Sequence, residues 1–212
     1  MEELSKIRKE YFKDTLERKD LNPDPVMQFR EWMNDAIEAG EMEPTAMSLA
    51  TVDSHHVPHV RTVLLKDITT DGLIFFTNYE SNKGRQISQN PMVAVNFYWP
   101  KLERQVRFVG KALKTTPEIS DQYFRERPAN SRIGAWISPQ SRVVKDEWIE
   151  MRFDEFKMMP QEECLVRPSH WGGYFIKPFE VEFWQGRPSR LHDRFVYIDN
   201  QESGWSIDRL AP

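Results

Sequence analysis

Hydrophobic positions along the chain change from a helical to a strand period near residue 45. Before that point, the apolar residues of segment 26–40 fall on one stripe at helical spacing: Val26, Phe29, Trp32, Met33 and Ile37. Asp24 followed by Pro25 suits an N-cap and first helical turn, and Gly40 suits the end. The pattern therefore predicts a helix here whose stripe packs against a core.

Short runs rich in apolar and β-branched residues follow, separated by polar turns. They cover residues 46–52, 59–66, 73–77, 92–99, 104–113, 173–176, 181–184, 194–197 and 205–209. Residues 117–156 instead have a helical character, with Pro117 and Pro128 as markers of helix boundaries and Asn130-Ser131 as a candidate cap. Many short strands joined by turns predict a mainly β fold with flanking helices, an antiparallel barrel whose closure removes exposed sheet edges.

The first 20 residues differ from the rest because they are highly charged and carry few apolar side chains. Those side chains recur at roughly helical spacing: Leu4, Ile7, Tyr11 and Leu16. The spacing predicts a short amphipathic helix, loosely attached to the remainder. We expect residues 1–212 to form a single domain.

Composition excludes several classes of protein. A net charge of -4 and a pI near 5.8 argue against a general nucleic-acid binder. No apolar run is long enough to span a bilayer and the N-terminus begins no secretory signal, so we expect a soluble, cytoplasmic protein. The single cysteine, Cys164, excludes an internal disulfide and a thiolate cluster, and its acidic neighbours disfavour a catalytic thiolate. None of the five histidines has zinc-ligand spacing, so no metal is expected.

The segment 181–197 concentrates candidate chemistry in a predicted hairpin, with its turn at 186–189. If the return strand is extended from its start, Arg190, His192 and Arg194 project from one face. Two guanidinium groups and an imidazole suit a phosphate, a carboxylate or the carbonyl-rich edge of a flavin or pyridine ring. A solvated hairpin end is an equally good interpretation of this segment alone.

A second candidate is the strand that begins at Arg61 and ends near Lys66. Its two cations lie about 16 Å apart when the strand is fully extended, a span that suits an elongated ligand with anionic ends. A regular strand places them on opposite faces, so both reach one cleft only if a bulge intervenes or Lys66 lies past the strand end. The alternative is that both residues are ordinary charges that protect an exposed sheet edge from pairing.

Two further clusters contain anion-binding residue types. A strand ending in Thr77 precedes a probable helix start at Ser81, where backbone N–H groups and Lys83 can hold a phosphate, although Ser81 can equally be only an N-cap. The other cluster is Tyr123, Arg127 and Ser131, which are four residues apart and share one face of a continuous helix. An ordinary exposed helix face is the alternative. Together the clusters suit a phosphorylated aromatic cofactor.

An ordered series of motifs, from about Ile7 to the last residue, resembles the pyridoxamine 5'-phosphate oxidase family. The motifs are Arg61-Thr62-Val63-Leu64-Leu65-Lys66, Phe76-Thr77-Asn78, Arg104-Gln105-Val106, Ser131-Arg132-Ile133-Gly134-Ala135, Gln140-Ser141, Trp171-Gly172-Gly173, Phe183-Trp184-Gln185-Gly186, Arg190-Leu191-His192-Asp193-Arg194 and Arg209-Leu210-Ala211-Pro212. The resemblance implies a split antiparallel β-barrel that binds FMN, and a homodimer with FMN at the subunit interface. It also implies oxidation of pyridoxine 5'-phosphate and pyridoxamine 5'-phosphate to pyridoxal 5'-phosphate, with O2 reduced to H2O2.

The resemblance also implies site residues, some of them contributed by the second subunit. The residues implied for FMN are Arg61, Thr62, Val63, Leu64, Leu65, Lys66, Phe76, Thr77, Ser81, Asn82, Lys83, Gln105, Gln140, Ser141, Trp184 and Arg194. Those implied for the substrate are Arg8, Tyr11, Lys66, Tyr123, Arg127, Ser131, Arg190 and His192. Arg190, His192 and Arg194 are the implied catalytic residues, and residues 1–20 are implied to form a mobile lid over bound substrate.

One position departs from the family pattern. The family commonly has Arg-Lys after the serine of the flavin-phosphate loop, where this chain has Asn82-Lys83. A missing guanidinium removes one charge-assisted hydrogen bond of about 1.5–3 kcal/mol, so weaker FMN binding is expected unless a neighbour compensates. Two alternative functions remain open: another flavin enzyme on the same barrel, and a non-catalytic protein that binds FMN or pyridoxal 5'-phosphate.

Overall fold

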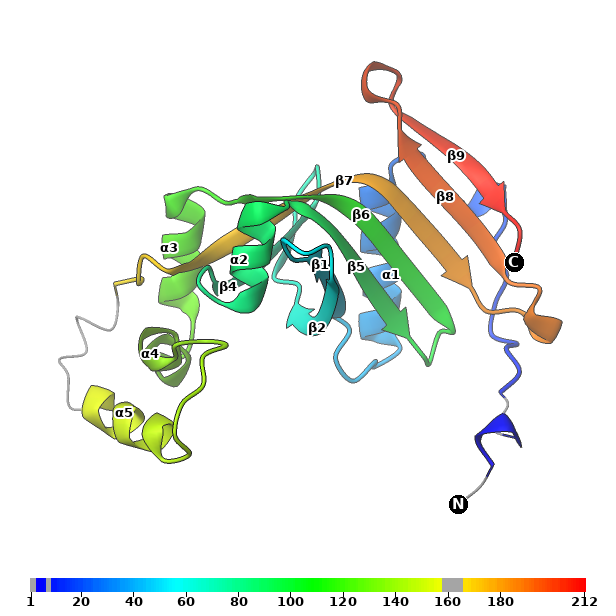
Figure 1. The fold of residues 1–212 in the computed structure, drawn as a ribbon. Helices are drawn as coiled ribbons and strands as arrows, with labels where there is room; N and C mark the ends of the chain where they lie inside the picture. Colours follow the sequence, from blue (N-terminus) through cyan, green and yellow to red (C-terminus); the bar gives the residue numbers. More distant parts are fainter. Residues whose placement is uncertain (1–2, 7–8, 158–165) are drawn as a thin grey trace.

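A strongly curled, nine-stranded antiparallel sheet organises the chain in the computed structural model, which describes residues 3–6, 9–157 and 166–212 (Figure 1). The strands are β1 (Ala46–Val52), β2 (Pro58–Leu64), β3 (Asp67–Ile68), β4 (Leu73–Asn78), β5 (Met92–Trp99), β6 (Arg104–Lys114), β7 (Trp171–Gln185), β8 (Asp193–Asp199) and β9 (Trp205–Leu210). The order is β2-β1-β5-β6-β7-β4-β3, with β8 on β7 and β9 on β8. The predicted mainly β fold with flanking helices is confirmed.

Strand β7 pairs with three neighbours. Along one edge it pairs with β6, with a register shift between Val109 and Gly110. Along the other edge its first part pairs with β4 and its last part with β8. The sequence pattern predicts two strands in this segment, but the structure has one, because the bulge keeps the ladder continuous past Pro178. The strand therefore connects two distant parts of the sheet.

Five helices flank the sheet in the described ranges: α1 (Pro25–Glu38), α2 (Asn82–Gln89), α3 (Pro117–Glu126), α4 (Ala129–Ile137) and α5 (Trp148–Lys157). Short 3-10 turns cover Leu4–Lys6, Arg18–Asp20, Pro188–Arg190 and Gln201–Ser203. Helix α1 is confirmed, and Asp24 Oδ1 accepts a hydrogen bond of 2.8 Å from Val26 N as its N-cap. Ile37 was wrongly expected in the buried stripe, because Ala36 forms the buried face of the last turn, at 0% exposure, and Ile37 is 55% exposed.

The main core lies between α1 and one face of the sheet. The Phe29 ring centre lies 4.8 Å from that of Phe97 and 4.9 Å from that of Phe108, and Trp32 meets Phe183 edge-on at 5.1 Å. All five of these phenylalanine and tryptophan residues are buried. The apolar stripe predicted from the sequence thus packs where expected.

The helical region after β6 is divided into three helices, where one face was predicted to continue through Tyr123, Arg127 and Ser131. Helix α3 ends at Glu126, and Arg127 has an extended backbone because a residue that precedes a proline disfavours the helical region. Pro128 occupies the N-cap position of α4, so the predicted cap at Asn130-Ser131 is wrong. The proline thus turns the chain at the point where the candidate anion site lies.

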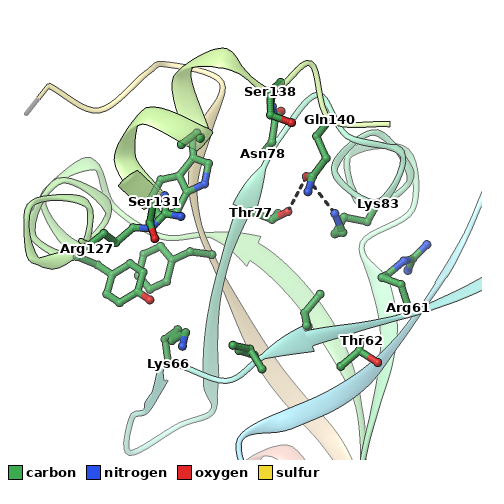
Figure 2. A pocket seen from close by; sticks show the side chains of 17 residues that line it. Arg61, Thr62, Lys66, Thr77, Asn78, Lys83, Arg127, Ser131, Ser138 and Gln140 are labelled. Carbon is green, nitrogen blue, oxygen red and sulfur yellow. Dashed lines mark hydrogen bonds between the residues drawn. The ribbon is translucent and has the colours of Figure 1, made fainter. Parts of the chain in front are cut away.

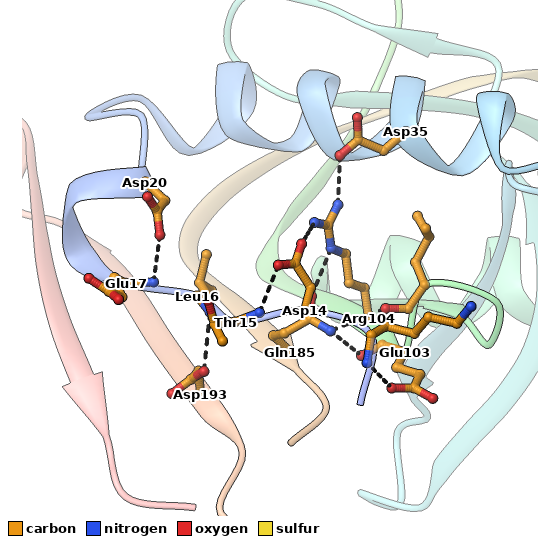
Figure 3. A network of polar contacts seen from close by, with 12 residues as sticks. Asp14, Thr15, Leu16, Glu17, Asp20, Asp35, Glu103, Arg104, Gln185 and Asp193 are labelled. Carbon is orange, nitrogen blue, oxygen red and sulfur yellow. Dashed lines mark hydrogen bonds and ion pairs between the residues drawn. The ribbon is translucent and has the colours of Figure 1, made fainter. Parts of the chain in front are cut away.

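In its described residues the N-terminal segment has two short 3-10 turns, Leu4–Lys6 and Arg18–Asp20, and is otherwise irregular, so the predicted amphipathic helix is wrong there. Its backbone is held by two buried carboxylates: Glu103 accepts from Phe12 N at 2.8 Å, and Asp193 accepts from Leu16 N at 3.1 Å (Figure 3). Arg104 adds ion pairs to Asp14 and Asp35. These tertiary contacts outweigh a weak helical preference in so short a segment. Ile7 lies outside the described residues, and the lid remains a prediction.

Among the helices of the described ranges, none is both long and apolar enough to cross a membrane.

Candidate functional site

A cavity of about 610 Å³ opens where the ends of β2 and β4 meet helices α2, α3 and α4 (Figure 2). Most of the residues implied for FMN and for the substrate phosphate line it. The lining residues are Arg61, Thr62, Val63, Leu64, Lys66, Phe76, Thr77, Asn78, Lys83, Tyr123, Arg127, Ser131, Gly134, Ala135, Ser138, Gln140 and Trp171. A volume in this range is typical of pockets for small ligands.

The cavity is positively charged. Four cationic side chains line it, and among the described residues no carboxylate does: the cations are Arg61, Lys66, Lys83 and Arg127. Figure 2 shows them in two groups, with Arg61 and Lys83 at one end and Lys66 and Arg127 at the other. Lys66 follows the end of β2 at Leu64, which is the arrangement that the sequence required for both ends of this strand to face one cleft. The cavity is therefore suited to a ligand, or a pair of ligands, with two anionic groups.

At the first end, both cations are bonded to neutral oxygen atoms. Arg61 donates to the Leu49 carbonyl at 3.0 Å, and Lys83 Nζ donates to Gln140 Oε1 at 3.2 Å. Burial, followed by the repulsion of nearby Arg61, lowers the pKa of Lys83 to about 8. Burial also lowers the pKa of Arg61. An uncompensated charge in a partly buried site favours the binding of an anion.

The loop before α2 closes this end. Ser81 caps α2, as predicted, by accepting a hydrogen bond of 3.3 Å from Gly84 N. Asn82 N donates to Ser141 Oγ at 3.2 Å, and the Asn82 side chain accepts from Arg85 at 2.5 Å. Ser81, Asn82 and Ser141 thus lie beside the cavity without lining it. They join the start of α2 to the segment that carries Gln140.

At the second end, Arg127 packs over an aromatic stack. Its guanidinium carbon lies 4.5 Å from the Trp171 ring centre, and the Tyr123 ring stacks on Phe76 at 4.0 Å. Buried Nη1 of Arg127 has no hydrogen-bond partner, and burial lowers the pKa of this residue while it raises that of Tyr123. An unpaired buried donor is costly unless a ligand satisfies it, so this nitrogen is a candidate contact for an anion.

The hairpin between β7 and β8 differs from the predicted geometry. A 3-10 turn covers Pro188–Arg190, with φ of 56° at Ser189 and 62° at Arg190, and β8 begins only at Asp193. The prediction that regular alternation places Arg190 on one face with His192 and Arg194 is therefore wrong. The reason is local: Leu191 N bonds back to the Pro188 carbonyl, and His192 Nδ1 accepts from Arg187 N at 3.1 Å.

The remaining predicted residues form a second set near this hairpin, away from the cavity. Gln105, Trp184 and Arg194 are direct cross-strand neighbours on β6, β7 and β8. His192 lies 4.6 Å from Trp184 between ring centres, and Tyr11 contacts both rings at 5.6 Å. Burial, then Arg190 and Arg194, lowers the pKa of His192, which favours its neutral form. Figure 1 shows β8 and β9 at one end of the molecule and α3 to α5 at the other.

One implied residue has another position, one lies outside the described residues, and several lining residues were not predicted. Leu65 is buried in the main core, and Arg8 lies outside the described residues. Trp171, Asn78 and Ser138 line the cavity although the sequence did not single them out as ligands. Asn78 and Trp171 are paired in the β4–β7 ladder, so recognising that strand pairing would have found them together.

Comparisons with known proteins identify similar sequences over the whole chain. The family model described as pyridoxamine 5'-phosphate oxidase matches residues 33–159, and that described as the pyridoxine 5'-phosphate oxidase C-terminal dimerisation region matches residues 171–212. A protein of Cytophaga hutchinsonii named pyridoxine/pyridoxamine 5'-phosphate oxidase is 50% identical over 99% of this chain and 98% of its own length. One of the same name from Paraburkholderia phymatum is 48% identical over the full length of both.

Two solved structures share the fold. PhzG from Burkholderia lata, in complex with tetrahydrophenazine-1-carboxylic acid, has a TM-score of 0.85 and 26% identity over 94% of this chain and 98% of its own. A pyridoxamine 5'-phosphate oxidase-related, FMN-binding protein from Nostoc punctiforme has a TM-score of 0.72 and 20% identity over 87% of this chain and 97% of its own. The second likeness concerns the fold alone.

Proposed function

Because the chain belongs to the pyridoxamine 5'-phosphate oxidase family, we propose that it is the FMN-dependent enzyme that forms pyridoxal 5'-phosphate. Its proposed substrates are pyridoxine 5'-phosphate and pyridoxamine 5'-phosphate. The alcohol and O2 give the aldehyde and H2O2, and the amine additionally consumes water and releases ammonia. The full-length relatives named for this activity make the chain an oxidoreductase.

The observation that carries the proposal is the separation of cations at the two ends of one cavity. An FMN phosphate requires one anion site, and a phosphorylated substrate requires a second. The first end offers Arg61, Lys83 and the start of α2, and its charges have only neutral partners. The second end offers buried Arg127 with its unpaired nitrogen. The residues present therefore fit FMN together with a phosphorylated substrate.

The proposed division of residues follows from these two ends. The FMN phosphate would bind to Arg61, Ser81, Asn82, Lys83, Gln140 and Ser141, with Thr62 to Lys66, Phe76 and Thr77 along the rest of the cofactor. The substrate phosphate would bind to Lys66, Tyr123, Arg127 and Ser131. Arg85, which donates to Asn82, supplies a guanidinium close to the position where the family commonly has one.

Each complete site is proposed to require two subunits. The match to a C-terminal dimerisation region supports a homodimer. Within one chain, Arg190 and His192 do not line the cavity, and neither do Gln105, Trp184 or Arg194. A partner that brings its hairpin to the cavity would complete the set. This arrangement is typical of a symmetric dimer, in which each subunit contributes the same residues to the site of its partner.

When bound, FMN supplies the two-electron acceptor that O2 reoxidises. The chain's own residues are proposed to position the reactants. Arg190 and His192 hold the substrate ring, and the cation of Arg194 stabilises negative charge near the cofactor. His192 is mainly neutral at pH 7, since its pKa is lowered, and its Nδ1 is committed to Arg187 N. It is therefore assigned to orientation and hydrogen bonding rather than to strong base catalysis.

The experiment that tests this function is aerobic incubation of the purified, FMN-loaded protein with pyridoxine 5'-phosphate. We expect pyridoxal 5'-phosphate and H2O2 in equal amounts over many turnovers. Pyridoxamine 5'-phosphate is tested in parallel. A flavin-loaded protein that gives neither product with either substrate would contradict the proposal and favour a non-catalytic binding protein.

A second candidate is a flavin enzyme that acts on another substrate, since PhzG, solved in complex with tetrahydrophenazine-1-carboxylic acid, shares this fold at 26% identity. The second cationic end of the cavity argues against it, because Lys66 and Arg127 are suited to a substrate with its own phosphate. Comparing pyridoxine with pyridoxine 5'-phosphate separates the two functions. We expect the unphosphorylated substrate to be used at least about 100-fold less efficiently, as loss of charged hydrogen bonds implies.

The lowered pKa of Lys83 predicts a pH-dependent FMN affinity. Below pH 8 the lysine of the free protein is charged, and its contribution to binding is constant. Above pH 8 it loses its proton and must regain it to pair with the phosphate, so the Kd should rise by up to about tenfold per pH unit. Flavin fluorescence titrations from pH 7 to 9.5 measure this. Lys83→Arg, which stays charged, should show no such break, and an identical break in this variant would refute the assignment.

A further inference from the structure

Arg61 is held by a closed ring of three hydrogen bonds that joins three elements. Its Nη1 donates to Thr51 Oγ1 on β1 at 2.7 Å, and its Nη2 donates to Gln86 Oε1 on α2 at 3.0 Å. The Thr51 hydroxyl in turn donates to Gln86 Oε1 at 2.6 Å. Since the hydroxyl accepts from the arginine, its own proton is directed to the amide oxygen. The ring fixes the plane of the guanidinium.

Thr51 and Gln86 are not part of the cavity lining, and both are buried, with 1% and 7% of their surface exposed. They cannot be explained as solvated polar residues. A guanidinium held among buried side chains usually pairs with a carboxylate, but partly buried Arg61 has a hydroxyl and an amide as its side-chain partners. The third partner, the Leu49 carbonyl, is also neutral. Arg61 is thereby oriented without loss of its net charge.

Lys83 and Tyr174 are titratable residues that lie on helix α2 or contact it near this ring. Lys83 lies one turn before Gln86 on α2, and the charge of Arg61 acts on it. Tyr174 on β7 reaches the same helix through its hydroxyl, which donates to the Gly84 carbonyl at 3.4 Å, and burial raises its pKa to about 12. Near neutral pH, a charge introduced at position 86 would therefore act first on the two cations, Arg61 and Lys83.

We propose that Thr51 and Gln86 are positioning residues that aim Arg61 at the cofactor phosphate, and that the neutral amide of Gln86 preserves the positive charge of that site. The inference rests on the proposed function, because it takes the FMN phosphate as the anion. A carboxylate at position 86 would make the same hydrogen bonds but would neutralise Arg61. The role of Gln86 is thus electrostatic as well as geometric.

The decisive variant is Gln86→Glu, compared with Gln89→Glu. Gln89 is exposed at the last position of the same helix, so the control adds the same charge away from the site. We expect Gln86→Glu to weaken FMN binding about tenfold or more, as expected when a charged hydrogen bond to the phosphate is weakened. It should also move the pH break of Lys83 upward from about 8, because a nearby negative charge favours the lysine cation. Flavin fluorescence titrations from pH 7 to 9.5 measure both effects.

A purely structural role predicts a different result, in which Gln86→Glu weakens binding but leaves the pH break unchanged. That result, or wild-type affinity in this variant, would overturn the inference. If Gln86→Glu fails to fold, Thr51→Val and Thr51→Ser decide: the hydroxyl-free variant should lose affinity severalfold, and the serine variant should keep it. Equal affinities of these two variants would also overturn the inference. A wild-type protein that does not bind FMN would instead refute the proposed function.

Discussion

Mixing subunits that carry Arg127→Met with subunits that carry Arg190→Leu should restore activity that neither variant has alone. Arg127 lines the cavity, whereas Arg190 lies on the hairpin at the far end of β7. Each homodimer lacks one charged partner in both sites, at a cost of about 1.5–3 kcal/mol, and should lose about 10- to 100-fold in kcat/KM. A mixed dimer has one site with both changes and one site with neither. Random reassociation should therefore give about a quarter of wild-type activity.

The matched control mixes Arg127→Met with Lys66→Met, two changes at the same end of one cavity. Every site of that mixed dimer still lacks one cation, so activity should stay low. Differently tagged subunits allow the mixed dimer to be purified and its composition verified by mass spectrometry. A verified Arg127→Met and Arg190→Leu dimer without recovery would mean that both residues serve a site within one subunit.

Replacing Phe108 by alanine should cost about 3–5 kcal/mol of the free energy of unfolding, a large part of the 5–15 kcal/mol typical of a domain. Phe108 is fully buried, and its ring centre lies 4.9 Å from Phe29 and 6.3 Å from Phe97. The change leaves a cavity between α1 and the sheet that the rigid ladder of β5 and β6 cannot close. Urea unfolding at one fixed protein concentration measures the loss.

Phe12→Ala is the control for this change, because Phe12 is 73% exposed and the same atoms are removed. It should alter the free energy of unfolding by less than about 0.5 kcal/mol. Similar losses in the two variants would show that the α1 face is not the main core. A folded Phe108→Ala protein should also keep its FMN affinity, since this residue lies outside the cavity lining.

The local patterns predicted the elements that bury one face. The alternation in 46–52 and 92–99 matches β1 and β5 at both ends, and the Asp24-Pro25 pair marks the start of α1. In these segments, burial and backbone preference favour the same structure. Periodicity did not predict the cavity: Arg61, Lys83 and Arg127, which line it, were candidate anion ligands by residue type and were implied as site residues only through the family motifs.

The predictions failed where contacts distant in sequence decide the conformation. Residues 9–16 are irregular rather than helical because Glu103 and Asp193, far along the chain, accept backbone N–H groups of this segment. Arg190 has a left-handed backbone in a turn closed by Pro188, which a simple alternation of side chains ignores. The ring that holds Arg61 also joins β1, β2 and α2, and no local motif contains it.

Strand β7 begins at Trp171 in the cavity wall and ends beside Trp184 in the hairpin set. The length of β7 therefore fixes the distance between the cavity wall and the hairpin residues. Side chains along it can be exchanged one at a time, but inserting one residue would turn every later side chain to the opposite face and shift the hairpin by about 3.3 Å. We expect deep insertion scanning to tolerate added residues in the surrounding loops and to reject them throughout this strand.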